Sequence, residues 1–297
     1  MSEKIIYEKF ETERLDAFLA AVYTDYSRSY FQKVIEKGAV FVNGKAVLPS
    51  RKLKRGDEIV FEFQKEELSR EIKPEKIELD IIYEDDDILV VNKRHGIVTH
   101  PSYGHPSGTL LNAVSAYSQG NFVPYLVHRL DKDTSGLIIF AKNEKAKISV
   151  SKQLQNRAVR KTYLAAVKGI IAENRGRIEA PLGRSPKNRK IMSVNPTAKK
   201  MAITEFKVVS RKEDYTLLEI RIITGRTHQI RSHMKYINHP VVGDVQYGGP
   251  ETIDGKTYTR QMLHAYNIIF THPRTCKEIS FLAPLPKDME DLFNDKT

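Results

Sequence analysis

Apolar positions in the first sixty residues follow the spacing of two short helices. The two predicted apolar faces consist of Leu15, Phe18, Leu19 and Val22, and then of Phe31, Val34 and Ile35. Ser27 is a suitable N-cap for the second helix, and Gly38 is a suitable end. The stretch "AVFVNGKAV" that follows places an Asn-Gly turn between two short strands. The pattern predicts a small unit of two helices and a hairpin over residues 12–60.

Short β-type runs dominate the chain from about residue 77 onward. They are "IIYEDDDILVVNK", "SGLIIFAK", "TYLAAVKG", "ITEFKVVSR", "TLLEIRIITG" and "NIIFTHP". Helical stretches lie between them, namely "GTLLNAVSAYSQ", "EKAKISVSKQLQ" and "RTHQIRSHMKYI". Residues 64–76, "QKEELSREIKPEK", are charged and have no apolar period, which is typical of a linker. We therefore expect a second domain over residues 77–297, of the α+β class, with a central, mostly antiparallel mixed β-sheet.

The charge of the chain points to a polyanionic partner. The 297 residues include 48 Lys and Arg against 37 Asp and Glu, which gives a net charge of +11 and a pI near 9.4. No apolar run approaches the roughly 18 residues of a membrane span, and "MSEKIIYEKF" lacks the apolar stretch of a signal peptide. The single cysteine, Cys276, excludes an intrachain disulfide and a thiolate-rich zinc site. These features predict a cytoplasmic protein without a membrane partner.

Metal and nucleophile chemistry find little support in the sequence. The run Asp85-Asp86-Asp87 lacks the glycine and distal glutamate of a calcium loop and is typical of a hairpin turn. His228 and His233 are five residues apart, which points their rings in different directions on a helix. The sequence contains no nucleophile elbow, glycine-rich phosphate loop or zinc-protease motif. We expect no metal site, and the remaining chemistry is that of a carboxylate acting on a polyanion.

The stretch "VHRLDKDTSGL", residues 127–137, holds two carboxylates between two apolar runs. Asp131 follows the alternation of "YLVHRL" and precedes "GLIIFA", so it lies where one strand ends before another begins. Asp133 belongs to "KDTSG", whose residues are those of an ordinary tight turn. A charge at Asp131, beside Arg129 and His128, is either exposed or paired. Taken alone, the stretch is also compatible with a purely structural turn.

A second stretch, "EIRIITGRTHQIRSHMKYINHP", residues 219–240, is predicted to change from strand to helix. The strand would end at Thr224-Gly225, and Arg226 and Thr227 would start the helix, whose N-terminus favours anions. From that corner the Arg226 guanidinium can bind a carboxylate of another segment and keep it ionised. A structural ion pair without any catalytic role is the alternative.

Two further stretches supply an aromatic ring and a group of cations. Tyr163 alternates with Ala165 and Val167 on one strand face, a pattern typical of a core position that can also place a ring against a nucleobase. Residues 184–200, "RSPKNRKIMSVNPTAKK", include six basic residues and no acidic one. Arg189 and Lys190 lie in this stretch, which is predicted to be a mobile loop that binds phosphates.

The N-terminal layout "RLD…SR…Q…I…G.V.VNG…GD.I" resembles the S4 domain, a small α/β RNA-binding module. This resemblance predicts an S4 domain over residues 1–70. It implies that Arg28, Lys33 and Lys37 contact phosphates, which position RNA without reading its sequence. A solvated basic helix face is the alternative meaning of these cations.

The rest of the chain, residues 77–285, resembles the RluA/RluD family of RNA pseudouridine synthases. The resemblance rests on "HRLDKDTSGL", "TGRTHQIR", "NHPVVGDVQYG" and "LHAYNIIFTHP", in this order along the chain. An S4 module is the usual companion of this family. The chain departs from the family pattern in "NKRHGIVTHP", where Arg94-His95 follows the lysine in place of a proline that would stiffen the loop.

The resemblance implies a role for each motif residue. Asp131 is the catalytic aspartate, and Arg129 helps to hold the target nucleotide flipped out of the RNA. Tyr163 stacks on uracil, and Arg226 pairs with Asp131. The implied reaction converts uridine to pseudouridine without a cofactor or a metal. The expected enzyme is a monomer that acts on large-subunit ribosomal RNA, with transfer RNA as the alternative substrate.

Two other classes of function remain open at this point. A glycosidic hydrolase directed at nucleic acid would ordinarily use a second carboxylate and would release free base. A non-catalytic RNA-binding protein would keep the S4 module and the basic loops but would not need Asp131.

Overall fold

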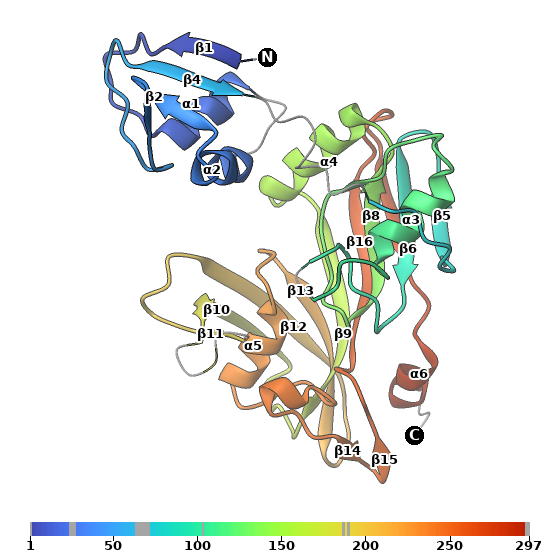
Figure 1. Cartoon of the computed structure of the whole chain (residues 1–297). Coiled ribbons are helices and arrows are strands. Elements are labelled where there is room, and N and C mark those ends of the chain that lie inside the picture. Colours follow the sequence, from blue (N-terminus) through green and yellow to red (C-terminus); the bar gives the residue numbers. More distant parts are fainter. Residues whose placement is uncertain are drawn as a thin grey trace. The chain divides into compact units, whose positions relative to one another are not determined.

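The structure is a computed structural model that describes residues 2–23, 28–62, 72–102, 104–185, 188 and 191–294. The chain divides into two units, residues 1–71 and 72–297 (Figure 1). Each unit has its own apolar core. The charged stretch predicted to be a linker falls at this division, and its residues 64–71 lie outside the described residues.

The first unit combines a sheet with two helices. Its described elements are β1 (Ser2–Ile6), α1 (Leu15–Val22), α2 (Arg28–Glu36), β2 (Val40–Val42), β3 (Lys45–Ala46) and β4 (Glu58–Glu62), and the strand order is β1-β4-β2-β3. Both predicted helices are confirmed and their apolar faces are buried, except that Val22, the last residue of α1, is 47% exposed. Asn43 and Gly44 have φ angles of 52° and 72° and form the predicted turn. Ser27 lies outside the described residues.

The second unit is built on one large sheet. Its described strands are β5 (Ile81–Glu84), β6 (Ile88–Lys93), β7 (Tyr125–Leu126), β8 (Ser135–Ala141), β9 (Arg160–Lys168), β10 (Arg175–Arg184), β11 (Met192–Val194), β12 (Met201–Arg211), β13 (Tyr215–Ile222), β14 (Thr252–Ile253), β15 (Lys256–Thr257), β16 (Leu263–Thr271) and β17 (Glu278–Leu282). Its described helices are α3 (Leu110–Ser118), α4 (Glu144–Gln155), α5 (Gln229–Tyr236), α6 (Lys287–Asn294) and the short 3-10 helix η1 (Val245–Tyr247).

The strand order of this sheet is β11-β10-β12-β13-β9-β16-β8-β6-β5, with β17 beside β16 and β7 beside β8. The strand pairs are antiparallel except for β8 and β16, which run parallel. The predicted α+β fold with a mostly antiparallel mixed sheet is therefore confirmed.

Three strands of the sheet, β10, β11 and β17, were not predicted. β10 contains Gly176, Pro181 and Gly183, which weaken the local signal for a strand, but the pairing with β12 overrides this preference. β11 lies inside residues 184–200, which were predicted to form a loop, and pairs with the end of β10. Part of that segment is therefore a hairpin.

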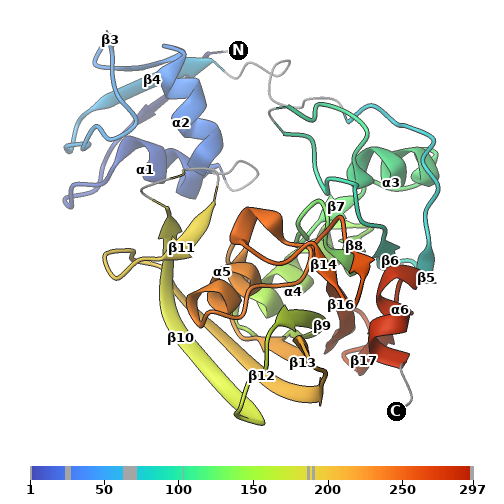
Figure 2. The same cartoon turned by 90° about the horizontal axis from the view of Figure 1, so that it is seen from below.

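Helices pack on the sheet near its two ends (Figure 1). Leu110, Leu111 and Val114 of α3 pack against β6 and β8. Ile230 and Met234 of α5 are buried against the other half of the sheet, as predicted. Figure 2 shows β10 and β12 curving around α5. This packing fixes the segment that leads from β13 into α5.

The helix α5 begins at Gln229, three residues later than predicted. The Gln229 side chain explains the difference: its oxygen accepts hydrogen bonds from the Arg226 N–H at 3.0 Å and the Thr224 hydroxyl at 2.7 Å. Its amide nitrogen donates to Ile203 O at 2.9 Å. The backbone therefore wraps around this carboxamide before the helix starts, and His228 takes a φ of 51°.

The parallel pair of strands joins distant parts of the chain. Ser135 and Gly136 at the start of β8 lie opposite His264 and Ala265 of β16. Gly136 has a φ of 109°, and a Cβ there would lie 2.3 Å from Ala265 O, so only glycine fits this close approach. The loop before β8 is thereby anchored against a strand near the end of the chain.

Candidate active site

A pocket of about 540 Å³ opens beside β9, between the loop that precedes β8 and the segment that leads into α5. This volume is in the usual range for a small-molecule or nucleotide site. The predicted site residues Arg129, Asp131, Tyr163 and Arg226 all line it. The structure therefore brings together the motifs that the sequence analysis selected separately.

The loop that carries Asp131 is held in place by groups behind it. The Thr99 hydroxyl donates to Leu130 O at 2.9 Å and accepts from Leu130 N–H at 3.3 Å. The Lys93 ammonium donates to Lys132 O at 2.8 Å and also to the carbonyls of Arg94 and Ile97 at 2.9 and 3.0 Å. These bonds fix the backbone on both sides of Asp131.

Lys93 is an unusual anchor because it is 1% exposed. Burial lowers its pKa to about 7, while the charges of Asp133 and Asp131 act in the opposite direction. The three carbonyl oxygens match the three N–H groups of an ammonium. Lys93 thus links the end of β6 to the loop that holds the candidate catalytic aspartate.

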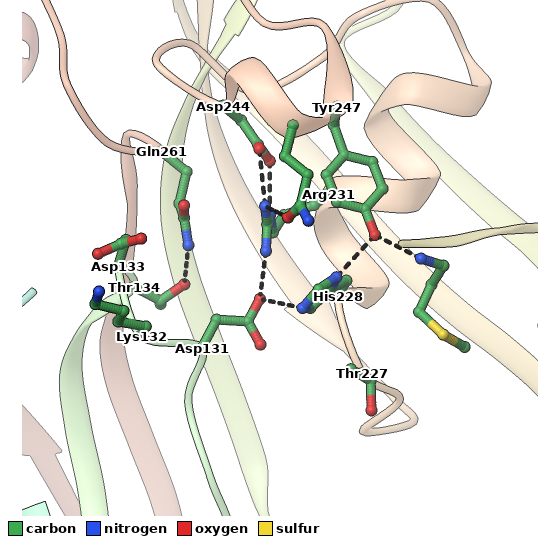
Figure 3. Close-up of polar contacts among 12 residues, drawn as sticks. Asp131, Lys132, Asp133, Thr134, Thr227, His228, Arg231, Asp244, Tyr247 and Gln261 are labelled. Carbon is green, nitrogen blue, oxygen red and sulfur yellow. Dashed lines mark hydrogen bonds and ion pairs between the residues drawn. The ribbon is translucent and has the colours of Figure 1, made fainter. Parts of the chain in front are cut away.

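The Asp131 carboxylate binds Arg231 and not Arg226. Asp131 Oδ2 is 3.1 Å from Arg231 Nη1, and the Asp131 side chain is 25% exposed (Figure 3). The predicted ion pair with Arg226 is wrong, because Arg226 precedes the helix and donates through Nε to Met201 O at 3.3 Å. Arg231 belongs to the first turn of α5, which points its guanidinium at Asp131.

Arg231 is itself fixed by three further groups. Its Nε and Nη2 bind the two oxygens of Asp244 at 2.6 and 2.8 Å, which is a bidentate ion pair. Nη2 also donates to Gln246 Oε1 at 2.8 Å, and the guanidinium lies 4.6 Å from the centre of the Tyr247 ring. Burial acts against the charge, but the bond to Asp244 and its negative charge hold the pKa of Arg231 above its ordinary value. Arg231 is therefore a permanent cation in a fixed position.

His228 connects Asp131 with Tyr247. Its Nε2 is 3.9 Å from Asp131 Oδ2, and its Nδ1 is 2.8 Å from the Tyr247 hydroxyl. That hydroxyl also accepts the Met192 N–H at 2.8 Å, so its own hydrogen is free to point to Nδ1. Burial lowers the pKa of His228, while the charge of Asp131 raises it. These contacts hold the imidazole at the wall of the pocket (Figure 3).

Tyr163 lies on β9, belongs to the buried core and also lines the pocket. Burial raises its pKa above the ordinary value, and the nearby charge of Asp131 adds to this effect. The side chain is therefore a neutral phenol at physiological pH. It offers the pocket an aromatic surface, which is what the predicted stacking role requires.

The remaining predicted pocket residues lie at its exposed side. Arg129 is exposed, and its Nη2 donates to the Thr227 hydroxyl at 2.6 Å. Arg226 is exposed as well. Arg189 and Lys190 lie outside the described residues.

Asp133 lies on the other side of the loop from Asp131 (Figure 3). Its backbone oxygen accepts from Arg260 Nη1 at 3.2 Å, and the next residue, Thr134, accepts from Gln261 Nε2 at 3.1 Å. Asp133 does not line the pocket. The two carboxylates of the motif therefore face different surroundings.

Sequence reasoning missed four residues of this region, namely Lys93, Lys161, His228 and Arg231. A signal for Arg231 was available: it directly follows Ile230, at the border of the side of the helix predicted to be buried, and a buried arginine needs an acidic partner. Asp244, in the nearby motif "NHPVVGDVQYG", is that partner. Lys161 is two residues before Tyr163, on the same face of β9.

The predicted RNA-contacting cations of the first unit lie on α2 and just after it. Arg28, Lys33 and Lys37 are exposed. The Arg28 guanidinium is also bonded to the buried Asp16 at 3.2 Å. Arg14 donates to the same carboxylate. This bond holds the pKa of Asp16 well below the ordinary value, although the burial of Asp16 acts in the opposite direction. Arg28 therefore orders the start of α2 in addition to being exposed.

One group of residues in the described part of the chain has ligand atoms close enough for a metal ion. Asp85, Asp87 and His272 place these atoms within 4.8 Å of one another. His272 Nε2 is 2.7 Å from Asp85, and Arg274 is 2.6 Å from Asp87, so ion pairs already account for the cluster. Asp85 Oδ1 also accepts the N–H groups of Asp87 and Ile88, which forms the predicted hairpin turn. The cluster does not line the pocket.

Comparison with known proteins places this fold and pocket in a family. The model of the RNA pseudouridylate synthase family matches residues 87–236, and the S4 domain model matches residues 13–59. The chain belongs to the RNA pseudouridylate synthase family, whose reaction is the isomerisation of uridine in RNA, and it carries an S4 domain. Of the three classes of function left open by the sequence, the comparisons support the isomerase. No helix in the described ranges has the length and apolar character needed to cross a membrane.

Similar proteins cover nearly the whole chain. The uncharacterized RNA pseudouridine synthase YlyB of Bacillus subtilis is 44% identical over 97% of this chain and 95% of its own length. The ribosomal large subunit pseudouridine synthase D of Neisseria meningitidis serogroup B is 43% identical over 95% of this chain and 78% of its own length. The solved structure of human RNA pseudouridylate synthase domain containing 1 has a TM-score of 0.59 and 29% identity over 70% of this chain and 84% of that one.

Proposed function

We propose that this protein converts uridines of large-subunit ribosomal RNA to pseudouridine, with the Asp131 carboxylate as the reacting group and without a cofactor. The observation that carries the proposal is the half-buried Asp131 at the pocket wall, 3.1 Å from a fixed arginine. The relative named for the ribosomal large subunit suggests the substrate, and the net charge of +11 suits a polyanion. Such a substrate would place the enzyme in the cytoplasm.

The reaction needs one carboxylate and a confined base. The bond between N1 of uracil and C1′ of ribose must break, and a bond from C5 to C1′ must form. An ionised Asp131 can either attack C1′ or remove a ribose proton while uracil departs. Arg231 supplies a fixed positive charge beside this carboxylate, and Asp244 keeps Arg231 in position.

The remaining pocket residues hold the substrate. The target nucleotide must leave its stack, which costs a few kcal/mol. Tyr163 offers an aromatic surface for the extruded uracil, and Arg129 occupies the exposed side of the pocket where the flipped nucleotide would be held. Because burial keeps Tyr163 protonated, we assign it the stacking role and not that of a base.

The test compares the two carboxylates of the motif. Asp131→Asn should abolish pseudouridine formation and leave folding and RNA binding nearly unchanged. Asp133→Asn is the matched control, since its side chain lies outside the pocket, and it should keep the activity. The product is measured by mass spectrometry after pseudouridine-specific derivatisation of ribosomal RNA from cells with and without the gene, and of RNA treated with the purified protein.

Three results would contradict this proposal. Full activity of a folded Asp131→Asn protein would exclude Asp131 as the reacting group. Inactivity of a folded Asp133→Asn protein that binds RNA would show that the wrong carboxylate was chosen. Release of free uracil in place of pseudouridine would show a hydrolase.

A further inference from the structure

Lys161 lines the pocket, and the proposed mechanism gives this cation no role. It lies on β9 two residues before Tyr163, and both side chains line the pocket. A Cβ added to Gly225 would lie 3.7 Å from Lys161 Nζ, so the ammonium lies against the backbone of the segment that leads into α5. The absence of a side chain at Gly225 leaves this space open.

The Lys161 ammonium has no partner among the residues that the structure describes. No hydrogen bond or ion pair within the described ranges involves its Nζ, although the side chain is half-buried. Burial lowers its pKa to about 8. A half-buried ammonium without a counter-ion is unfavourable, and an anion that enters the pocket would relieve this.

We propose that the Lys161 ammonium binds the detached uracil and stabilises the negative charge that the base carries between bond breaking and bond formation. This inference rests on the proposed function, in which uracil leaves C1′ beside Asp131 and stacks on Tyr163. It gives Lys161 a role in the reaction itself, in contrast to a role in holding the RNA backbone.

The positions of the three residues support this assignment. The charge of Asp131 acts on Tyr163, so the aromatic ring lies near the carboxylate. Lys161 is one side-chain step further along the same face of β9, roughly 7 Å from Tyr163 along the strand. A uracil ring that stacks on Tyr163 with its ribose at Asp131 therefore directs its far edge towards Lys161.

The chemistry explains why a cation is useful at this edge. When the N1–C1′ bond breaks, the electron pair stays on uracil, and the charge is shared by N1, O2 and O4. When C5 attacks C1′, C5 loses its proton and N1 gains one, so the charge disappears. Lys161 exchanges no proton in this scheme. A fixed donor aimed at charge that exists only during the reaction lowers the barrier more than it strengthens substrate binding.

The experiment uses the full-length protein with Lys161→Met, Lys161→Arg and the control Lys168→Met. Lys168 is exposed at the far end of the same strand and does not line the pocket. We expect Lys161→Met to lower kcat about 10²-fold, with little change in the dissociation constant for RNA. Lys161→Arg should recover much of the turnover, and Lys168→Met should equal the wild type. Circular dichroism checks that each variant is folded.

The pH dependence provides a second readout that a purely structural role would not change. In the wild type, kcat/KM should fall as the pH rises through about 8, because the free enzyme then loses the Lys161 charge. Lys161→Arg should keep its activity to higher pH, since a guanidinium stays protonated. The other titratable groups that line the pocket are Asp131, His128, Tyr163 and His228, and its arginines are Arg129, Arg157, Arg226 and Arg231. Burial lowers the pKa of His128 to about 3, so His128 does not produce a fall near pH 8. A fall that persisted unchanged in Lys161→Arg would come from another group, such as Lys93 behind the loop.

Two outcomes would overturn the inference. If Lys161→Met raised KM and weakened RNA binding but left kcat unchanged, with a smaller salt dependence of binding, Lys161 would bind a phosphate. If Lys161→Met had wild-type activity at every pH, Lys161 would have no role. Neither result affects the proposed function, which depends on the Asp131 and Asp133 variants alone.

Discussion

Replacing Arg231 by methionine would show whether this cation serves the reaction or only the fold. Arg231 binds Asp131 at 3.1 Å and Asp244 at 2.6 and 2.8 Å, and the Asp244 side chain is 1% exposed. The substitution therefore leaves a buried carboxylate without its counter-ion. Breaking a buried ion pair from one side costs about 3–5 kcal/mol. We expect the free energy of unfolding of Arg231→Met to fall by about that amount.

A second substitution separates stability from activity. Adding Asp244→Asn removes the stranded charge and keeps the shape of the side chain. The double variant should recover most of the lost stability, because a neutral amide costs less to bury than a carboxylate. It should not recover pseudouridine formation, because Asp131 still lacks the cation that lies 3.1 Å away in the wild type.

Thermal unfolding and product analysis measure these two effects. In a unit of this size each kcal/mol shifts Tm by about 2–4 °C, so Arg231→Met should melt about 6–20 °C below the wild type. Turnover is measured at saturating RNA and at a temperature where all variants are folded. The turnover of both variants should be at least about 10²-fold lower than that of the wild type. A double variant with wild-type turnover would refute a role for Arg231 beyond the fold.

Two further predictions concern the anchor of the loop and the first unit. Lys93 has a pKa of about 7 when folded and 10.5 as the ordinary value, so between these pH values the unfolded chain binds more protons. Its contribution should therefore make the free energy of unfolding rise with pH across this window, by up to about 1.4 kcal/mol per pH unit. Between pH 7 and pH 9, the free energy of unfolding measured with urea should rise less for Lys93→Met than for the wild type. An equal rise in the two proteins would contradict the lowered pKa of Lys93. Removal of residues 1–71 should leave a folded second unit, because that unit has its own core. The fragment should lose RNA affinity more than turnover at saturating RNA, and the salt slope of binding, about −0.7 per phosphate contact, should become shallower; an aggregated fragment would show that the second unit does not fold alone.

Local periodicity predicted the elements of the fold well, because each element depends on its own residues. The two helices of the first unit and α3 and α4 formed where the apolar spacing placed them, and α5 formed with a later start. The strand order could not be predicted in the same way. β9 pairs with β13 and β16, which follow much later in the chain, and nothing in the sequence of β9 specifies these partners. The strand β10 was missed because its glycines and proline weaken the local signal.

In the candidate site, too, local motifs identified residues, whereas contacts between distant segments could not be predicted. The motifs selected Arg129, Asp131 and Tyr163, and the structure places all three in one pocket. The partner of Asp131 was assigned to the wrong arginine because the start of α5 was predicted too early. The hydrogen bonds of the Gln229 side chain to four different residues determine that start, and such bonds are visible only in the folded chain.

The parallel pairing of β8 with β16 also affects when the enzyme becomes active during its synthesis. The loop with Asp131 leads directly into β8, yet the neighbouring strand β16 is made 129 residues later, as the contact between Ser135 and His264 shows. The first unit has its own core and leaves the ribosome before the second unit. A nascent chain can therefore fold its S4 domain early, whereas the candidate active site is completed only when β16 has emerged. Translation thus orders the two abilities of the protein, RNA binding first and modification last.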